Sequence, residues 1–151
     1  FACVTAAASW VLQRRSVARA ELEARPKTII VGDIHGCVDE FRDLVAKCGF
    51  RRGVDRVVLV GDLVAKGPDS GAVIDFAKSI GATGVMGNHD YNVLTYADGE
   101  PQFEHGHHED VAASLTPEQL AYLRSLPMFL RIPEHNVLVV HAGLRPGMRP
   151  E

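Results

Sequence analysis

The sequence predicts an α/β fold whose functional site lies at the carboxyl ends of its strands. Short aliphatic and β-branched runs alternate with segments of helical periodicity, which is the pattern of strands separated by helices. Three runs end in glycine followed by an acid or an amide, and a fourth ends in histidine: Gly32-Asp33, Gly61-Asp62, Gly87-Asn88 and Val140-His141. Because ligands bind outside the carboxyl ends of strands in such sheets, these residues indicate one shared site.

The composition is that of a globular chain of about one domain. Of its 151 residues, 46% are hydrophobic and 23% are charged, which excludes a disordered tail or a collagen-like chain. The net charge is −3 and there is no basic stripe, so we expect no binding to a nucleic-acid duplex. Cys3, Cys37 and Cys48 form no CxxC pair, which argues against a zinc ribbon or a disulfide framework and favours a reducing compartment.

Residues 1–26 are predicted to form an N-terminal helical extension, and residues 27–151 the N-terminal part of the main domain. The apolar start, 1–12, is shorter than the ~20 residues of a spanning helix, and Pro26 stops the helical pattern. An amphipathic helix and a cytoplasmic location are therefore favoured. The alternative is the end of a signal sequence or of a membrane anchor with a basic flank. Since the chain begins at Phe1 and stops soon after His141, we expect a fragment that lacks its C-terminal part.

The first part of the domain is predicted to alternate strands with helices that end at glycines. Lys27–Val31 is a β-branched run that reads as a buried strand. The following segment carries apolar residues at helical spacing up to the stop at Gly49. Pro68 to Ser70 has the residues of a helix start, and Gly81 ends that helix. The expected strands are 27–31, 56–60 and 83–86, and the expected helices are 38–48, 68–80 and 88–97.

The second part is predicted to hold a polar loop, a helix and two strands. Residues 98–110 are rich in Gly, Glu and His and read as a loop over the site, with surface histidines at positions 105, 107 and 108. Thr116 and Pro117 are the N-cap and first residue of a helix that runs to Ser125. Strands follow at 128–132 and 137–140, separated by a turn at 133–136.

The residues at the strand ends predict a centre of two divalent metal ions. Asp33 and His35 are two apart in an extended segment and so face the same side. Asp62, Asn88 and His141 add a carboxylate, an amide oxygen and an imidazole. This mixed set suits Mn, Fe, Co or Zn better than Mg or Ca. Two ions ~3.5–4 Å apart need a bridging ligand, and Asp62 is the candidate because its strand lies between the other two.

Three further residues beside these ligands have the chemistry of phosphate-ester cleavage. His89 follows Asn88 directly and is the candidate general acid, with Asp90 expected to orient its ring and keep it basic. Lys66 lies four residues after Asp62 and is expected, together with Asn88, to bind the phosphate of the substrate.

Four linked motifs resemble the calcineurin-like metallophosphoesterases: Gly32-Asp33-Ile34-His35-Gly36, Gly61 to Ser70, Gly87-Asn88-His89-Asp90 and His141-Ala142-Gly143. The resemblance covers about residues 27–147. It implies a metallophosphoesterase-type β-sandwich flanked by helices. It also implies that Asp33 and His35 hold the first metal, that Asp62 bridges, that Asn88 and His141 hold the second, and that His89 is the acid with Asp90 as its partner.

Within that superfamily the sequence is most similar to the diadenosine tetraphosphatase-like phosphatases. Protein phosphatases of the same branch typically have an arginine, often after an aspartate, where this chain has Ala65 and Lys66. Lysine cannot form the planar, bidentate contact with phosphate that arginine forms. The implied partner is a phosphorylated small molecule or polymer: a dinucleoside polyphosphate, a nucleotide cap or polyphosphate. The alternatives are a Ser/Thr protein phosphatase and a non-catalytic phosphate- or metal-binding module. A further C-terminal histidine of the family pattern is not in this chain.

Overall fold

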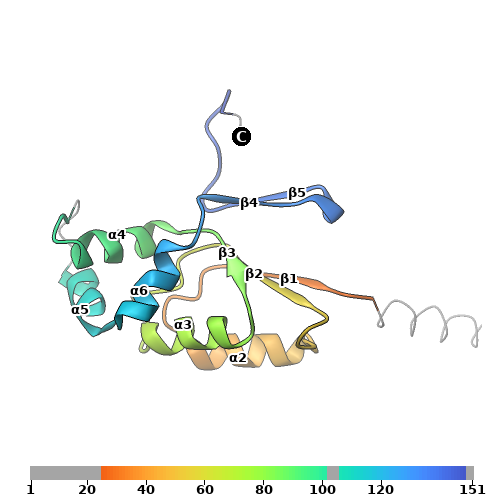
Figure 1. Cartoon of the computed structure of the whole chain (residues 1–151), viewed down its shortest axis with the longest axis horizontal. Helices are drawn as coiled ribbons and strands as arrows, with labels where there is room; N and C mark the ends of the chain where they lie inside the picture. Colours follow the sequence, from red (N-terminus) through yellow and green to blue (C-terminus); the bar gives the residue numbers. More distant parts are fainter. Residues whose placement is uncertain (1–24, 102–105, 149–151) are drawn as a thin grey trace, which may run out of the picture.

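The described part of the chain forms two stacked sheets, with helices on the outer face of one of them (Figure 1). The computed structural model describes residues 25–101 and 106–148, so the predicted extension lies outside the described residues except at its last two positions. Strands β1 (Thr28–Val31), β2 (Arg56–Leu59) and β3 (Thr83–Gly84) pair in parallel in the order β1-β2-β3. Strands β4 (Phe129–Ile132) and β5 (Val137–Val140) form an antiparallel pair. The predicted α/β fold is confirmed.

The larger hydrophobic core lies between the parallel sheet and helices α2 (Val38–Lys47) and α3 (Ser70–Ser79), which cover its lower face in Figure 1. Helix α2 buries Val38, Phe41 and Val45 along one stripe, as its spacing predicts. Helix α3 begins where the side chain of Asp69 accepts a hydrogen bond from the backbone N–H of Ala72. The two helices therefore support the parallel sheet from one side.

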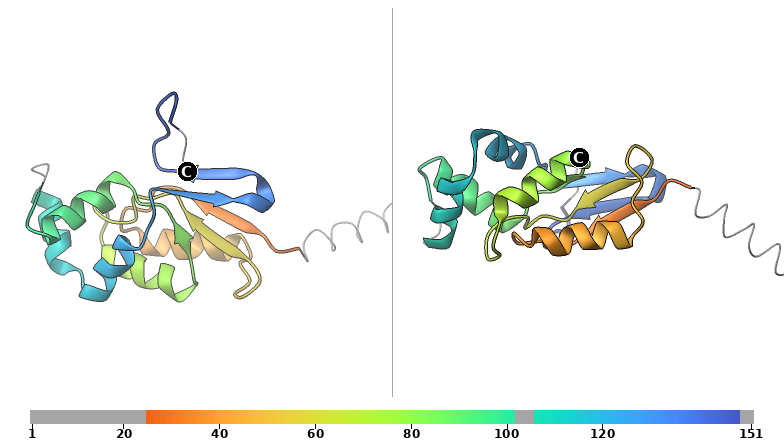
Figure 2. Two further views of the ribbon diagram at one scale, coloured as in Figure 1. Left: turned by 45° about the horizontal axis from the view of Figure 1, so that its top comes forward. Right: turned by 90° about the horizontal axis from the view of Figure 1, so that it is seen from below.

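The second sheet covers the opposite face of the parallel sheet (Figures 1 and 2). A small apolar cluster joins the two sheets and consists of Val58, Val85, Ile132 and Val139. Strand β3 is shorter than predicted. Its continuation leaves the parallel ladder because the N–H of Met86 donates to the carbonyl of Pro127, just before β4. Between β4 and β5, residues Pro133–His135 form one 3-10 turn.

Helices α4 (Asn88–Ala97), α5 (Gly106–Ser114) and α6 (Pro117–Arg124) gather beyond the carboxyl ends of the parallel strands (Figure 1). The predictions of α4 and α6 are confirmed, but residues 106–110 are helical rather than part of a loop. The reason is a buried stripe at helical spacing, His108, Val111, Ala112 and Leu115. Within the described ranges, none of the helices has the length and apolar character to cross a bilayer.

Candidate metal centre

The loops after the strands bring the predicted ligands together. The backbone N–H groups of Ile34 and His35 donate to the carbonyl of Asp62, at 3.0 and 2.9 Å, so the loop after β1 rests on the loop after β2. Ligand atoms within 4.8 Å of one another form two groups, His35 with Asp62 and His89, and Asp33 with Asp62 and His141. Asp62 belongs to both groups, and its side chain is almost fully buried.

The two carboxylate oxygens of Asp62 face different histidines. Oδ2 lies 3.6 Å from Nε2 of His35, and Oδ1 lies 3.6 Å from Nε2 of His141. The backbone N–H of His89 also donates to Oδ1, at 2.9 Å, and fixes the rotation of the carboxylate. Asp62 has a φ of +54°, a left-handed conformation that aspartate tolerates better than most residues. This arrangement places one carboxylate between two imidazoles.

Both imidazoles are held in the tautomer that a metal ligand needs. Nδ1 of His35 lies 3.1 Å from the carbonyl of Val64, and Nδ1 of His141 lies 2.8 Å from the carbonyl of Val60. A carbonyl only accepts, so each Nδ1 carries a hydrogen and donates it. Nε2 of the neutral ring then holds a lone pair directed into the cluster. A hydrogen bond from the second ring nitrogen to a carbonyl is the usual support of a metal-ligating histidine.

Asn88 completes the donor set on the side of His141. Its Oδ1 lies 3.0 Å from Nε2 of His141. Because the hydrogen of the neutral His141 ring is on Nδ1, Nε2 and the amide oxygen are both acceptors, and their lone pairs face each other with no hydrogen between them. A cation between them removes this repulsion. The donor set of carboxylates, imidazoles and an amide therefore fits divalent ions of the borderline class.

Two glycines allow the strand ends to approach each other this closely. Gly61 has a φ of +91°, which side chains rarely adopt. A Cβ atom at this position would lie 2.6 Å from the backbone nitrogen of Gly87 and 2.9 Å from Nδ1 of His141. A Cβ atom at Gly87 would overlap Asp62. The glycines that precede Asp62 and Asn88 are thus steric requirements of the cluster.

The expectation that Asp90 orients the ring of His89 is wrong. Asp90 is fully buried, and its Oδ1 accepts from the backbone N–H groups of Leu63 and Val64, at 2.8 and 3.2 Å. Its Oδ2 accepts from the N–H of Gly87, at 2.9 Å. Burial raises the pKa of the Asp90 carboxyl above its ordinary value, against the effect of these three amides. Asp90 therefore ties the loop after β2 to the start of α4.

His89 contacts a histidine instead. Its Nδ1 lies 2.8 Å from Nε2 of His108, and its ring meets the ring of His35 edge to face, with centroids 4.9 Å apart. His89 thus stands against the cluster on one side and against α5 on the other. His89 is also close enough to His35 and Asp62 to belong to one of the ligand groups.

Lys66 lies at the exposed edge of the cluster. Its Nζ donates to Nε2 of His35, at 3.0 Å, which places the ammonium group beside the lone pair that points into the site. Lys66 and the preceding Ala65 both have left-handed backbone conformations, with φ of +66° and +68°. The N–H of Ala65 donates to Oγ of Ser70, and the N–H of Lys66 donates to Nε2 of His107, at 3.0 and 2.8 Å. These bonds hold the turn.

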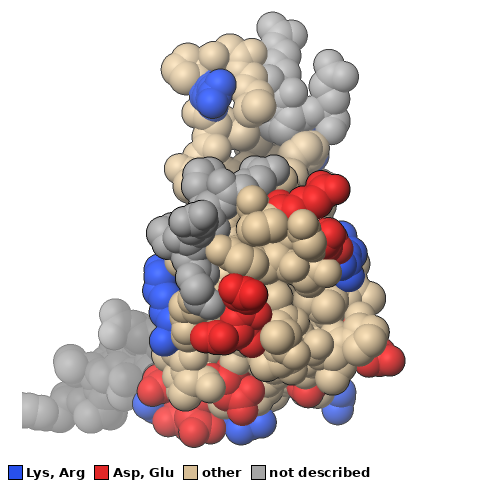
Figure 3. All heavy atoms as spheres, turned by 90° about the vertical axis from the view of Figure 1, so that its left-hand side faces the viewer, with Lys and Arg blue, Asp and Glu red and all other residues tan. Residues whose placement is uncertain are grey.

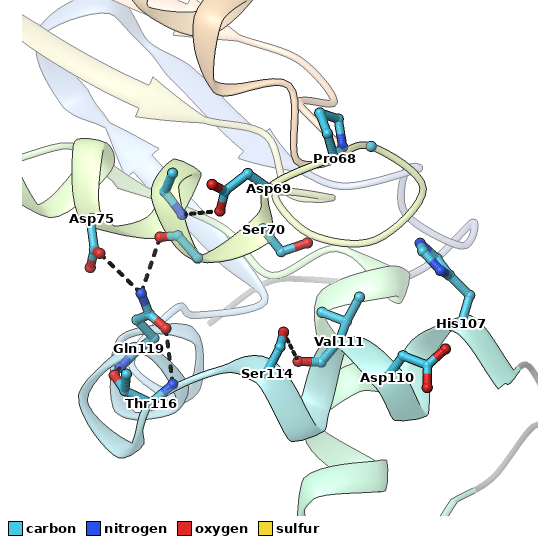
Figure 4. Close-up of a pocket in the computed structure, with 13 residues that line it drawn as sticks. Pro68, Asp69, Ser70, Asp75, His107, Asp110, Val111, Ser114, Thr116 and Gln119 are labelled. Carbon is cyan, nitrogen blue, oxygen red and sulfur yellow. Dashed lines mark hydrogen bonds between the residues drawn. The ribbon is translucent and has the colours of Figure 1, made fainter.

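A pocket of about 570 Å³ lies beside this turn, between the start of α3 and helices α5 and α6 (Figure 4). The carboxylates of Asp69, Asp75 and Asp110 line it. Figure 3 looks onto the same end of the molecule and shows acidic side chains on this face, with the basic ones mostly at its margins. The pocket therefore repels phosphate groups, whereas Lys66 attracts them.

Sequence reasoning missed the contribution of His107 and His108, which it placed in a surface loop. The sequence did contain a helical signal, because His108 is followed at helical spacing by the apolar residues Val111, Ala112 and Leu115. The polar composition of residues 98–110 concealed it. Ser70 was expected only as part of a helix start, but its hydroxyl also accepts a hydrogen bond from the N–H of Ala65.

Comparison with known proteins identifies the family. A family model for the calcineurin-like phosphoesterases matches residues 26–150. The symmetrical bis(5'-nucleosyl)-tetraphosphatase of Psychromonas ingrahamii is 38% identical over 125 residues, which cover 79% of this chain and 45% of the relative. The enzyme of the same name from Aromatoleum aromaticum is 42% identical over 126 residues, which cover 80% of this chain and 45% of the relative. The chain thus spans less than half the length of these two relatives.

Solved structures agree with this result. A crystal structure provisionally assigned as a diadenosine tetraphosphatase superimposes with a TM-score of 0.74 at 45% identity, over 82% of this chain and 52% of the other. A metallophosphoesterase from Sphaerobacter thermophilus shares the fold, with a TM-score of 0.56 at 22% identity over 70% of this chain and 42% of the other. Since the family model spans most of its length, the chain belongs to the calcineurin-like phosphoesterase family.

Proposed function

We propose that the protein hydrolyses phosphate esters or anhydrides with two divalent metal ions, and that dinucleoside polyphosphates are its substrate class. The two bacterial relatives described above are named as tetraphosphatases of this kind. Manganese, iron, zinc and cobalt suit the mixed donor set. Asp33 and His35 would hold one ion, since Oδ2 of Asp33 lies 3.7 Å from Nε2 of His35. Asn88 and His141 would hold the other, with Asp62 shared between them.

The observation that carries this proposal is the placement of Asp62. Its two oxygens face two imidazoles whose lone pairs point inward. A carboxylate between two separate ligand sets is the arrangement that a pair of ions requires. Ions held there would activate water and offset the charge on the phosphate oxygens. A site for a single ion would not need histidines on both sides of one carboxylate.

The remaining residues have separate tasks in this proposal. Lys66 binds the phosphate oxygens at the open edge of the cluster and neutralises their charge. His89 protonates the leaving oxygen as its bond to phosphorus breaks, and acid catalysis of this kind contributes ~10²–10⁴-fold. An anhydride leaves as a weaker base than an alkoxide, so the contribution of His89 is smaller for anhydrides. Asp90 acts as a positioning residue for the loop of Asp62.

The shared ligand is tested by comparing Asp62→Asn with Asp33→Asn. Both changes keep the shape of the side chain, and asparagine also tolerates the left-handed conformation of residue 62. Asp62→Asn should lose both ions and more activity than Asp33→Asn, which should mainly weaken one site. Metal content by mass spectrometry and hydrolysis of p-nitrophenyl phosphate measure the two effects. Two ions retained in Asp62→Asn, with equal losses of activity, would contradict the shared role.

The substrate class is tested with a panel at equal metal concentration: diadenosine tetraphosphate, capped RNA, long-chain polyphosphate and a phosphoserine peptide. The proposal expects the highest kcat/KM for the dinucleotide. Preference for the phosphopeptide would support a protein phosphatase instead. Tight binding of phosphate, with no turnover of any member of the panel, would indicate a binding module.

A further inference from the structure

The first turn of α5 contacts both of the residues to which the proposed function gives a direct role in phosphate cleavage. His107 and His108 are consecutive, and they reach different loops. Nε2 of His108 lies 2.8 Å from Nδ1 of His89 at the start of α4. Nε2 of His107 accepts a hydrogen bond from the backbone N–H of Lys66, at 2.8 Å. One helical turn thus supports the candidate acid and the candidate phosphate-binding cation.

The surroundings of His108 hold its ring firmly. Its residue is only 4% exposed, and the ring stacks on that of Tyr96, with an interplanar angle of 23° and centroids 6.4 Å apart. The rings of His89 and His108 have centroids 4.9 Å apart. A buried ring with restricted rotation offers a fixed hydrogen-bond partner, so the direction of Nδ1 of His89 is fixed as well.

His107 lies in different surroundings from the buried His108. His107 is exposed, and it contacts the backbone of Lys66 rather than its ammonium group. The turn at Ala65 and Lys66 has two successive left-handed residues, each of which is unfavourable without glycine. A hydrogen bond to that turn helps to keep it in the conformation that presents Nζ of Lys66 at the cluster.

We propose that His108 is the positioning residue for His89, and that His107 is the positioning residue for Lys66. This inference rests on the proposed function. In the cleavage step a water oxygen bonds to phosphorus and gives up one proton to the solvent, and the bond from phosphorus to the leaving oxygen breaks. That oxygen keeps the electron pair and takes the proton from Nε2 of His89. Throughout, Nδ1–H of His89 donates to Nε2 of His108, which selects the tautomer left after the proton has gone.

The test compares His108→Ala, His108→Gln and His107→Ala on two substrates in the metal-loaded protein. An alkyl phosphate needs the acid, whereas p-nitrophenyl phosphate has a good leaving group and needs it little. His108→Ala should lower kcat for the alkyl phosphate by roughly 10- to 100-fold, the scale of a misplaced catalytic group, and change kcat for the aryl substrate less than about threefold. His108→Gln should recover most of the loss, since its amide oxygen can accept from Nδ1 of His89.

His107→Ala should give the opposite pattern, with KM raised for both substrates more than kcat is lowered. His135→Ala is the matched control, because His135 is an exposed histidine between β4 and β5. Equal losses on both substrates in His108→Ala, without recovery in His108→Gln, would show a purely structural role and overturn the inference. Unchanged kinetics in both alanine variants would overturn it too.

A readout without metal separates this inference from the proposed function. In ¹⁵N-labelled metal-free protein, long-range ¹H–¹⁵N spectra of the histidine rings report which nitrogen carries the hydrogen. His89 should be the Nδ1–H tautomer in the parent protein and in His108→Gln, and a mixture of tautomers in His108→Ala. If the parent hydrolyses nothing but shows this change, the proposed function fails and the positioning contact stands. The same tautomer in all three proteins would refute the contact.

Discussion

Replacement of Asp90 by alanine should destabilise the protein through three backbone groups at once. The variant removes the acceptor of the buried N–H groups of Leu63, Val64 and Gly87. An unsatisfied buried donor costs about 1–3 kcal/mol, so three of them predict a loss of at least about 3 kcal/mol. Since single substitutions rarely cost more than about 5 kcal/mol, the expected loss is about 3–5 kcal/mol. For a chain of this size that is a fall in Tm of roughly 6–20 °C.

The conservative variant gives a graded result. In Asp90→Asn the amide oxygen can still accept from Leu63 and Val64, but its NH₂ group then faces the N–H of Gly87. One backbone donor is left unsatisfied and the NH₂ group opposes it, so the expected loss is smaller than in Asp90→Ala, at about 1–3 kcal/mol. Urea denaturation measures both variants, with Asp39→Ala as the control, because Asp39 is exposed and pairs only with Arg42 within the described residues. If Asp90→Ala were as stable as the control, Asp90 would not link the loop after β2 to the start of α4 in the way described.

Three further predictions concern the site and its support. Gly61→Ala should lower the free energy of unfolding by about 2–5 kcal/mol, because the positive φ costs about 1–2 kcal/mol and the steric overlap about 1–3 kcal/mol. The variant should also bind metal more weakly, and an unchanged affinity in a calorimetric metal titration would contradict this. Lys66→Ala should raise KM for phosphate-rich substrates while Lys66→Arg retains activity and shifts substrate preference, so steady-state kinetics identical to the parent in both variants would refute the phosphate role. The guanidinium of Arg51 holds the pKa of Asp55 well below its usual range. Because the folded-state pKa is lowered, the ionised carboxylate stabilises the fold above about pH 4, and this contribution is lost as the pH falls below that value. Asp55→Asn should therefore differ from the parent in urea midpoint at pH 7 but much less at pH 2.

The sequence was sufficient to predict the elements whose signals are local. The glycine stops, the capping residues Asp69 and Thr116, and the spacing of apolar residues gave α2, α3, α4 and α6 within a residue or two. It was also sufficient to bring the ligands to one place, because the carboxyl ends of parallel strands meet at one edge. These inferences need only periodicity and the geometry of a parallel sheet.

What the sequence could not provide were partners chosen by tertiary packing. Asp90 follows His89 in the chain, so an orienting contact was the natural expectation. On a helix, however, adjacent side chains point in different directions, and Asp90 turns inward to the backbone of the loop after β2. The true neighbour of His89 is His108, nineteen residues away, and this contact depends on how α5 packs on α4.

The junction between the two sheets has a consequence for how metal and stability are coupled. His141 follows β5, whereas Asp33, His35 and Asp62 follow the strands of the other sheet. Within the described residues, the apolar cluster between the sheets has four buried side chains, with Val60 and Leu130 partly buried against it. A cation bound by both His141 and Asp62 would link the two sheets. At a hundred times its dissociation constant it would stabilise the form in which the sheets are packed together by about 2.7 kcal/mol. Chelation would then release the β4–β5 hairpin before the helix-backed sheet, and amide hydrogen exchange would show faster exchange at Ile132 and Val139 while Val57 stayed protected.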